Sequence, residues 1–136
     1  MPASISIAAA QRREFQIEEG NKMAVRVITP SPQALLAALK KAIDEKKVET
    51  WKYDSQGDFT HTPQQWTLKC WLRPHVEAGA LVFTTIPPKN TALSREIYGI
   101  YHGRFIEMLL AHFDQQFSQV GATALAAVGD LVGASA

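Results

Sequence analysis

Residues 94–117 read SREIYGIYHGRFIEMLLAHFDQQF, and the fold depends on this stretch. Its apolar residues recur at helical spacing, and Ser94 is a natural N-cap whose hydroxyl can accept a hydrogen bond from a backbone amide of the first turn. Glu96 stands in that turn, where a carboxylate meets the positive end of the helix dipole. The pattern predicts one helix from Ser94 to about Phe117.

The predicted helix is apolar around most of its circumference. A surface helix needs an apolar stripe of about 100°, and this one is about twice as wide, so a single sheet cannot cover it. The second cover could be the first helix of the chain, the Ala-rich segment 122–132 or another copy of the protein. Gly99 and Gly103 lie four residues apart, a spacing that lets another backbone approach closely. We therefore expect either an intramolecular partner for this helix or a homodimer.

The chain upstream begins with a strand and a helix. Residues 23–28 alternate as a short strand does. Ser31 is a natural N-cap and Pro32 suits the first helical position, so a helix should run from about residue 32 to 47. Its apolar stripe contains Leu35, Leu36, Leu39 and Ile43.

Residues 51–86 change to the two-residue period of strands. Gly57 lies in a turn and can take a positive φ, which predicts a hairpin around it. Pro74 should end the longer strand that follows, because proline lacks the backbone donor that a sheet needs. Short connections favour an antiparallel meander. Its expected strands cover residues 51–54, 59–62, 66–73 and 80–86.

These elements predict a two-layer α+β domain. An antiparallel sheet of four to five strands would be packed by one amphipathic helix and by the long C-terminal helix. We expect residues 1–22 to form a weakly structured arm, with an edge strand at residues 15–17, and residues 23–118 to form the domain. Residues 119–136 would be a tail rich in Ala and Gly, with a helix as one option.

Composition narrows the classes of protein. The chain has 136 residues with 14 basic and 13 acidic side chains, and this balance argues against duplex DNA as a partner. Cys70 is the single cysteine, so no internal disulfide can form, and its apolar neighbours indicate a small buried side chain rather than a nucleophile. No motif for a phosphate-binding loop, a metal or a cofactor is present, so we expect neither cofactor nor metal. Without a secretory core near Met1 or a span long enough to cross a bilayer, we expect a cytoplasmic protein that does not enter membranes.

The densest group of polar aromatic and ionisable residues runs from Tyr98 to Phe105. Tyr98, Tyr101 and His102 recur at three and four residues, and Arg104 lies beside them. Such a ledge could bind an anion through Arg104 and His102, or form a protein interface, since Tyr and Arg are common at binding hot spots. A third interpretation is that these side chains simply pack in the core, with Arg104 paired to Glu107 or Glu96.

His112 lies at the centre of the first apolar face, so we expect it to be buried. A buried imidazole needs a polar partner, which could be a carbonyl or hydroxyl of the core. Alternatively, His112 could be a general base on the floor of a pocket. A pocket that joined His112, Tyr101 and His61 would favour that reading.

A third surface could bind nucleic acid. Trp71 is flanked by Lys69 and Arg73, and aromatic residues between cations on a sheet can stack and neutralise a single strand.

The sequence thus leaves three functional hypotheses. The first is a small non-catalytic binding or protein-interaction module, homodimeric, with an unknown protein or small molecule as its partner. The second is an acid–base enzyme that uses His102 or His112 with Arg104 and Tyr101 on a small anion or RNA. The third is single-stranded nucleic-acid binding through Trp71, Lys69 and Arg73.

Overall fold

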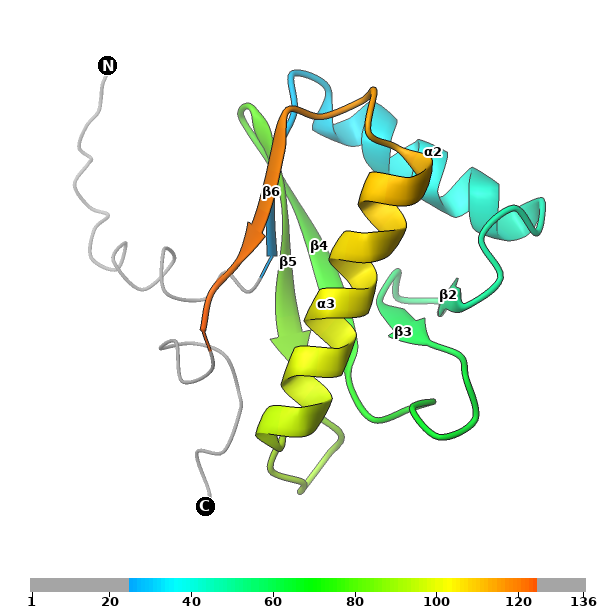
Figure 1. Ribbon diagram of the computed structural model, residues 1–136, viewed down its shortest axis with the longest axis vertical. Coiled ribbons are helices and arrows are strands. Elements are labelled where there is room, and N and C mark those ends of the chain that lie inside the picture. Colours follow the sequence, from blue (N-terminus) through cyan, green and yellow to red (C-terminus); the bar gives the residue numbers. More distant parts are fainter. Residues whose placement is uncertain (1–24, 125–136) are drawn as a thin grey trace.

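The computed structural model describes residues 25–124 (Figure 1). In chain order its elements are β1 (Val25–Ile28), α2 (Pro32–Asp44), β2 (Trp51–Tyr53), β3 (Phe59–His61), β4 (Trp71–Glu77), β5 (Ala80–Ile86), α3 (Arg95–His112) and β6 (Gln119–Ala122). The expected arm at residues 1–22 and most of the expected tail lie outside the described residues.

The strands form one antiparallel sheet in the order β2-β3-β4-β5-β1-β6. The α+β class, the antiparallel meander and the inner position of β5 are confirmed. The sheet has six strands rather than four to five, because the segment 119–122 forms β6 instead of the start of a tail. It pairs with β1, where Val25 lies opposite Ala122, and Figure 1 shows β6 at the edge of the sheet.

The core lies between the two helices and one face of the sheet. Helix α3 crosses that face in Figure 1, and its buried residues Tyr101, Phe105 and Leu109 belong to the same cluster as Leu35 and Leu39 of α2. The sheet contributes Val25, Val27, Phe59, Leu72, Leu81 and Phe83 to this cluster. Burial of this apolar surface is the main source of stability for a domain of this size.

Helix α3 begins as the sequence predicts and ends earlier. The Ser94 hydroxyl accepts a hydrogen bond from the Ile97 amide at 3.1 Å. The helix ends at His112, not Phe117, because the chain turns back toward β1, where the Ser118 amide donates to the Ile28 carbonyl at 2.9 Å. Phe113 is buried and Phe117 packs against the core, so the chain itself covers this flank of the helix.

The strand expected at residues 66–73 is displaced along the chain. Residues 66–70 form turns whose polar backbone groups bond to side chains: the Lys69 amide donates to the Tyr101 hydroxyl at 3.2 Å, and the Tyr101 hydroxyl donates to the Trp66 carbonyl. Pro74 lies inside β4 rather than at its end. It is tolerated because β3 pairs with β4 at Leu72, so β4 is an edge strand beyond that point.

The end of α2 sets up the site described next. The helix stops at Asp44 rather than at Lys47, and Lys46 takes the left-handed conformation with a φ of 64°. The Lys47 and Val48 amides then both donate to the Ala42 carbonyl, at 2.8 and 3.2 Å. At the other end, Ser31 is the N-cap residue, but its side chain forms no cap hydrogen bond.

Candidate functional site

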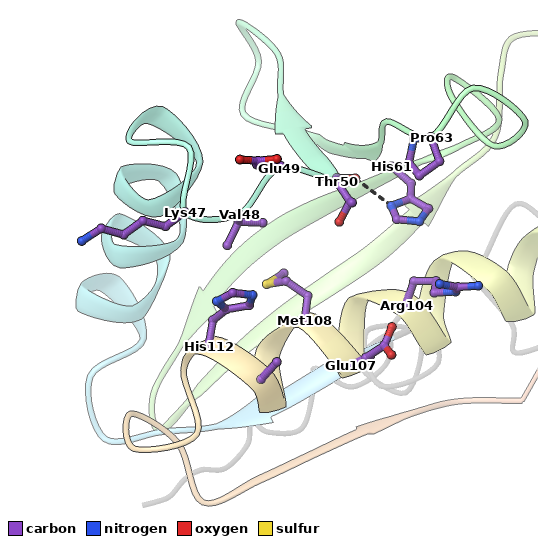
Figure 2. Close-up of a pocket in the computed structure, with 11 residues that line it drawn as sticks. Lys47, Val48, Glu49, Thr50, His61, Pro63, Arg104, Glu107, Met108 and His112 are labelled. Atoms are coloured by element: carbon purple, nitrogen blue, oxygen red, sulfur yellow. Dashed lines mark hydrogen bonds between the residues drawn. The ribbon is translucent and has the colours of Figure 1, made fainter.

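A pocket of about 440 Å³ opens between the second half of α3 and the segment that leads from α2 to the end of the β2–β3 hairpin (Figure 2). Its walls combine basic, acidic and apolar side chains. The lining residues are Lys47, Val48, Glu49, Thr50, His61, Pro63, Arg104, Glu107, Met108, Ala111 and His112.

His61 is the most constrained polar side chain of the pocket. It is the last residue of β3, opposite Trp51 in the register, and the two rings lie 4.5 Å apart between centroids. Tyr101 meets the His61 ring edge-on at 5.9 Å. His61 is 3% exposed, and Figure 2 shows its ring directed toward α3.

The hydrogen bond of His61 fixes which ring nitrogen carries the proton. Nδ1 lies 2.7 Å from the Thr50 carbonyl oxygen. A carbonyl oxygen can only accept, so Nδ1 donates and the neutral ring keeps its lone pair on Nε2. No residue of the described chain hydrogen-bonds to Nε2. The pocket therefore contains a nitrogen acceptor with no protein partner among residues 25–124. Within that range the buried side-chain polar atom without a partner is Trp51 Nε1, so Nε2 is the part of His61 that solvent or a ligand in the pocket can reach.

The surroundings of His61 favour its neutral form. Burial is the largest effect and lowers the pKa of His61 below its usual value of 6.5. The hydrogen bond to the Thr50 carbonyl raises the pKa, the Arg104 cation lowers it, and the Glu107 carboxylate raises it, but burial dominates.

Arg104 and Glu107 reach the pocket from one face of α3. Both are exposed, and neither forms an ion pair or hydrogen bond with a residue in the range 25–124. The expected pairing of Arg104 with Glu96 or Glu107 is therefore absent from that range. Arg104 and Glu107 are three residues apart on α3, so a cation and a carboxylate lie side by side there and are available to a ligand.

His112 also lines the pocket, and the expectation of a buried imidazole is wrong. It is exposed because α3 ends at this residue, in the last turn at the rim of the pocket. Lys47 and Val48 line the same end of the opening (Figure 2).

The other residues of the predicted ledge point into the core. Tyr98, Tyr101 and His102 are 5%, 0% and 3% exposed. The Tyr98 hydroxyl bonds to Thr123 at 2.9 Å, which ties α3 to the chain after β6. The segment is therefore a packing face, and Arg104 is the one predicted ledge residue that belongs to the pocket.

His102 is a core histidine with both nitrogens engaged. Nδ1 donates to the Tyr98 carbonyl, and Nε2 accepts from the Thr85 hydroxyl at 2.7 Å. Burial lowers the pKa of His102 to about 4. The side chain thus joins α3 to β5 and lies outside the pocket.

The surface around Trp71 offers less charge than the sequence indicated. Trp71 is half-buried, and Lys69 lies in the turn before β4. The Arg73 guanidinium is bound by the Asp58 carboxylate, with Nε and Nη2 at 2.9 and 2.8 Å from its two oxygens. One of the two cations expected to contact nucleic acid is therefore already neutralised.

Sequence reasoning missed several residues of the pocket. Lys47, Glu49 and Thr50 follow α2 in a connection with no motif of its own, and Met108 fits the pattern of a core residue. The segment between α2 and β2 packs near α3, and this places Lys47, Glu49 and Thr50 in one pocket with Met108. The tertiary fold creates this proximity, and no local sequence pattern predicts it.

Across residues 25–124, no three His, Cys, Asp or Glu side chains gather in a group that could hold a metal ion. Neither of the described helices combines the length and apolar character needed to span a membrane.

Comparison with known proteins gives no relative from which a function could be transferred: no family model, no curated protein and no solved structure matches this chain.

Proposed function

We propose that this chain is a small non-catalytic binding protein that holds a small polar molecule in the pocket between α3 and the hairpin. The proposal is carried by the buried His61, whose Nδ1 is fixed by Thr50 and whose Nε2 is directed into a pocket beside Arg104. Nε2 is the open acceptor of an otherwise buried ring, and a bound molecule can give it a hydrogen bond in place of water.

The acid–base hypothesis receives less support from the same geometry. It requires His102 or His112 with Tyr101 in one site, but His102 and Tyr101 are engaged in the core. His61 and His112 line one pocket, but His112 is exposed, and no hydrogen bond within residues 25–124 orients its ring. Binding needs only the acceptor, cation and carboxylate that line the pocket.

The proposal can be tested with nuclear magnetic resonance. Acetate, inorganic phosphate, methylamine and leucine would be added separately to labelled protein. At least one should shift the signals of His61 and Met108, because those side chains line the pocket. The shifts should shrink in Arg104→Gln and persist in Arg95→Gln, an exposed arginine of α3 outside the pocket. The proposal fails if no probe moves these signals, or if Arg104→Gln leaves every shift intact.

A second candidate function is self-association through the outward face of α3. Leu110 is 53% exposed on this face. A Cβ built at Gly99 or Gly103 would meet no described atom within 4 Å, so the expected close approach of another backbone is not made inside residues 25–124. An exposed apolar side chain on the same face of α3 as two glycines favours a contact with a second copy of the chain.

Light scattering after size-exclusion chromatography tests this candidate. We expect the protein to form a dimer and Leu110→Gln to shift it toward the monomer. Leu68→Gln serves as the control, because Leu68 is equally exposed, at 52%, but lies in the turns before β4. A native protein that remains monomeric at high concentration would exclude the dimer.

A further inference from the structure

The pocket lining carries both signs of charge. Arg104 is its available cation, because the Lys47 ammonium lies 3.3 Å from the Glu45 carboxylate and is directed away from the pocket in Figure 2. Glu49 and Glu107 bring two carboxylates. A ligand with several negative charges would be attracted by Arg104 and repelled by the two carboxylates. A ligand that carries one charge of each sign would match Arg104 and a carboxylate together.

Two opposite charges of the pocket lining are arranged side by side. Arg104 and Glu107 are three residues apart, so their Cβ atoms are neighbours on one face of α3. Both line the same pocket as His61. The Arg104 guanidinium can hold a carboxylate with two parallel hydrogen bonds. The Glu107 carboxylate can only accept, so it suits a group that donates.

His61 makes the same demand as Glu107. Its Nε2 lone pair accepts a hydrogen bond, and the ring stays neutral because it is buried. The two acceptors together suit an ammonium group, which offers three donors and one positive charge.

The remaining lining is apolar. Val48, Pro63, Met108 and Ala111 complete the walls, and Figure 2 shows Met108 rising from α3 toward the side on which Val48 lies. An aliphatic group placed there would bury apolar surface. Methionine adapts its shape to such a group.

We infer that the ligand is an α-amino acid with an aliphatic side chain: Arg104 binds its carboxylate, Glu107 and His61 Nε2 bind its ammonium group, and Met108 and Val48 contact its side chain. This inference rests on the proposed function, since it names the ligand class of the same pocket.

The inference is tested by comparing leucine with two truncated analogues. Isopentylamine is leucine without its carboxylate, and isocaproate is leucine without its ammonium group. By calorimetry on the full chain, leucine should bind at least about tenfold more tightly than either analogue, because each lacks one of the two charged contacts.

Variants assign each contact. Arg104→Gln and Glu107→Gln should each weaken leucine binding by about tenfold. Arg95→Gln and Glu96→Gln change the same residue types on exposed positions of α3 outside the pocket, and leucine binding should be unchanged in both.

The outcomes separate the two proposals. If isocaproate or phosphate binds at His61 as tightly as leucine, the amino-acid inference is overturned and the binding function stands. If leucine binds but is insensitive to Arg104→Gln and Glu107→Gln, the inference is also overturned. If none of the compounds binds in the pocket, both proposals fall together.

Discussion

The Arg73 guanidinium donates hydrogen bonds to both carboxylate oxygens of Asp58 and thereby links β4 to the hairpin formed by β2 and β3. The Asp58 side chain is 5% exposed, whereas that of Arg73 is 45% exposed. Next to this ion pair, Phe59 and Leu72 pair in the short ladder between β3 and β4. The hairpin is thus held to the rest of the sheet by an ion pair as well as by backbone hydrogen bonds.

Removal of Arg73 should destabilise this junction. Arg73→Leu leaves the buried Asp58 carboxylate without its partner, which should lower the free energy of unfolding by about 2 kcal/mol. Urea unfolding measures the change, with Arg95→Leu as a control on the exposed surface of α3. A loss below about 0.5 kcal/mol would show that the pair behaves as an ordinary surface ion pair.

Stability should fall between pH 6.5 and 4 because of His102. Its pKa is lowered from 6.5 to about 4 in the folded protein. In that interval the unfolded chain binds a proton that the folded protein does not. The stability that follows from the lowered pKa of His102 is therefore complete above pH 6.5 and is lost as the pH falls toward 4. The loss should reach about 3 kcal/mol.

Urea unfolding at a series of pH values checks this, with His102→Gln as the comparison. The pH dependence should be less steep in the variant, whatever its stability at pH 7. His61 acts in the same direction, because its pKa is also lowered, so a residual slope is expected. Identical slopes in the native protein and the variant would contradict the assignment to His102.

Leu68 occupies a backbone conformation that leucine rarely adopts. Its φ is 57° and its side chain is 52% exposed. Asparagine tolerates the left-handed region better, so Leu68→Asn should stabilise the protein by about 1 kcal/mol. Leu68→Ala keeps the Cβ that causes the conflict and should give little gain. Thermal unfolding of both variants is the measurement, and equal midpoints would argue against backbone strain at this residue.

Cys70 should be inert in the folded protein. It is fully buried, and burial raises the pKa of its thiol. A thiol-specific reagent at pH 8 should leave it unmodified until urea unfolds the chain. The control adds a cysteine in the exposed hairpin turn, Ser55→Cys, which should react at once. Modification of Cys70 at the rate of the added cysteine would show that the core opens locally.

Much of the fold could be predicted where local patterns and tertiary structure agree. The start of α3 at Ser94, the hairpin around Gly57 and the limits of β5 follow from capping, turn and alternation signals. The alternation at residues 66–70 was misleading, because the Tyr101 hydroxyl binds the backbone there and replaces ladder hydrogen bonds. Strand β6 had no strong signal of its own, and β1 provides the template for it.

Less of the pocket than of the fold could be predicted from the sequence. The sequence indicates Arg104 and His112 as candidates and His61 as a histidine that could join them, and all three line the pocket. The helical wheel could not tell which face of α3 the sheet would cover, so Tyr98, Tyr101 and His102 were expected in a site and are buried instead. The segment from Lys47 to Thr50 reaches the pocket because α2 ends at Asp44, a limit set by the Lys46 backbone conformation.

The pairing of Val25 with Ala122 brings the beginning and the end of the described chain side by side. Tension applied at these two positions would separate β6 from β1 one hydrogen bond at a time, because antiparallel neighbours pulled from the same end open successively. The pairing between β6 and β1 should therefore break at low force. The hairpin strands β2 and β3 lie at the opposite edge of the sheet, and β3 carries His61 of the pocket wall, so the pocket should be the last part to be disrupted.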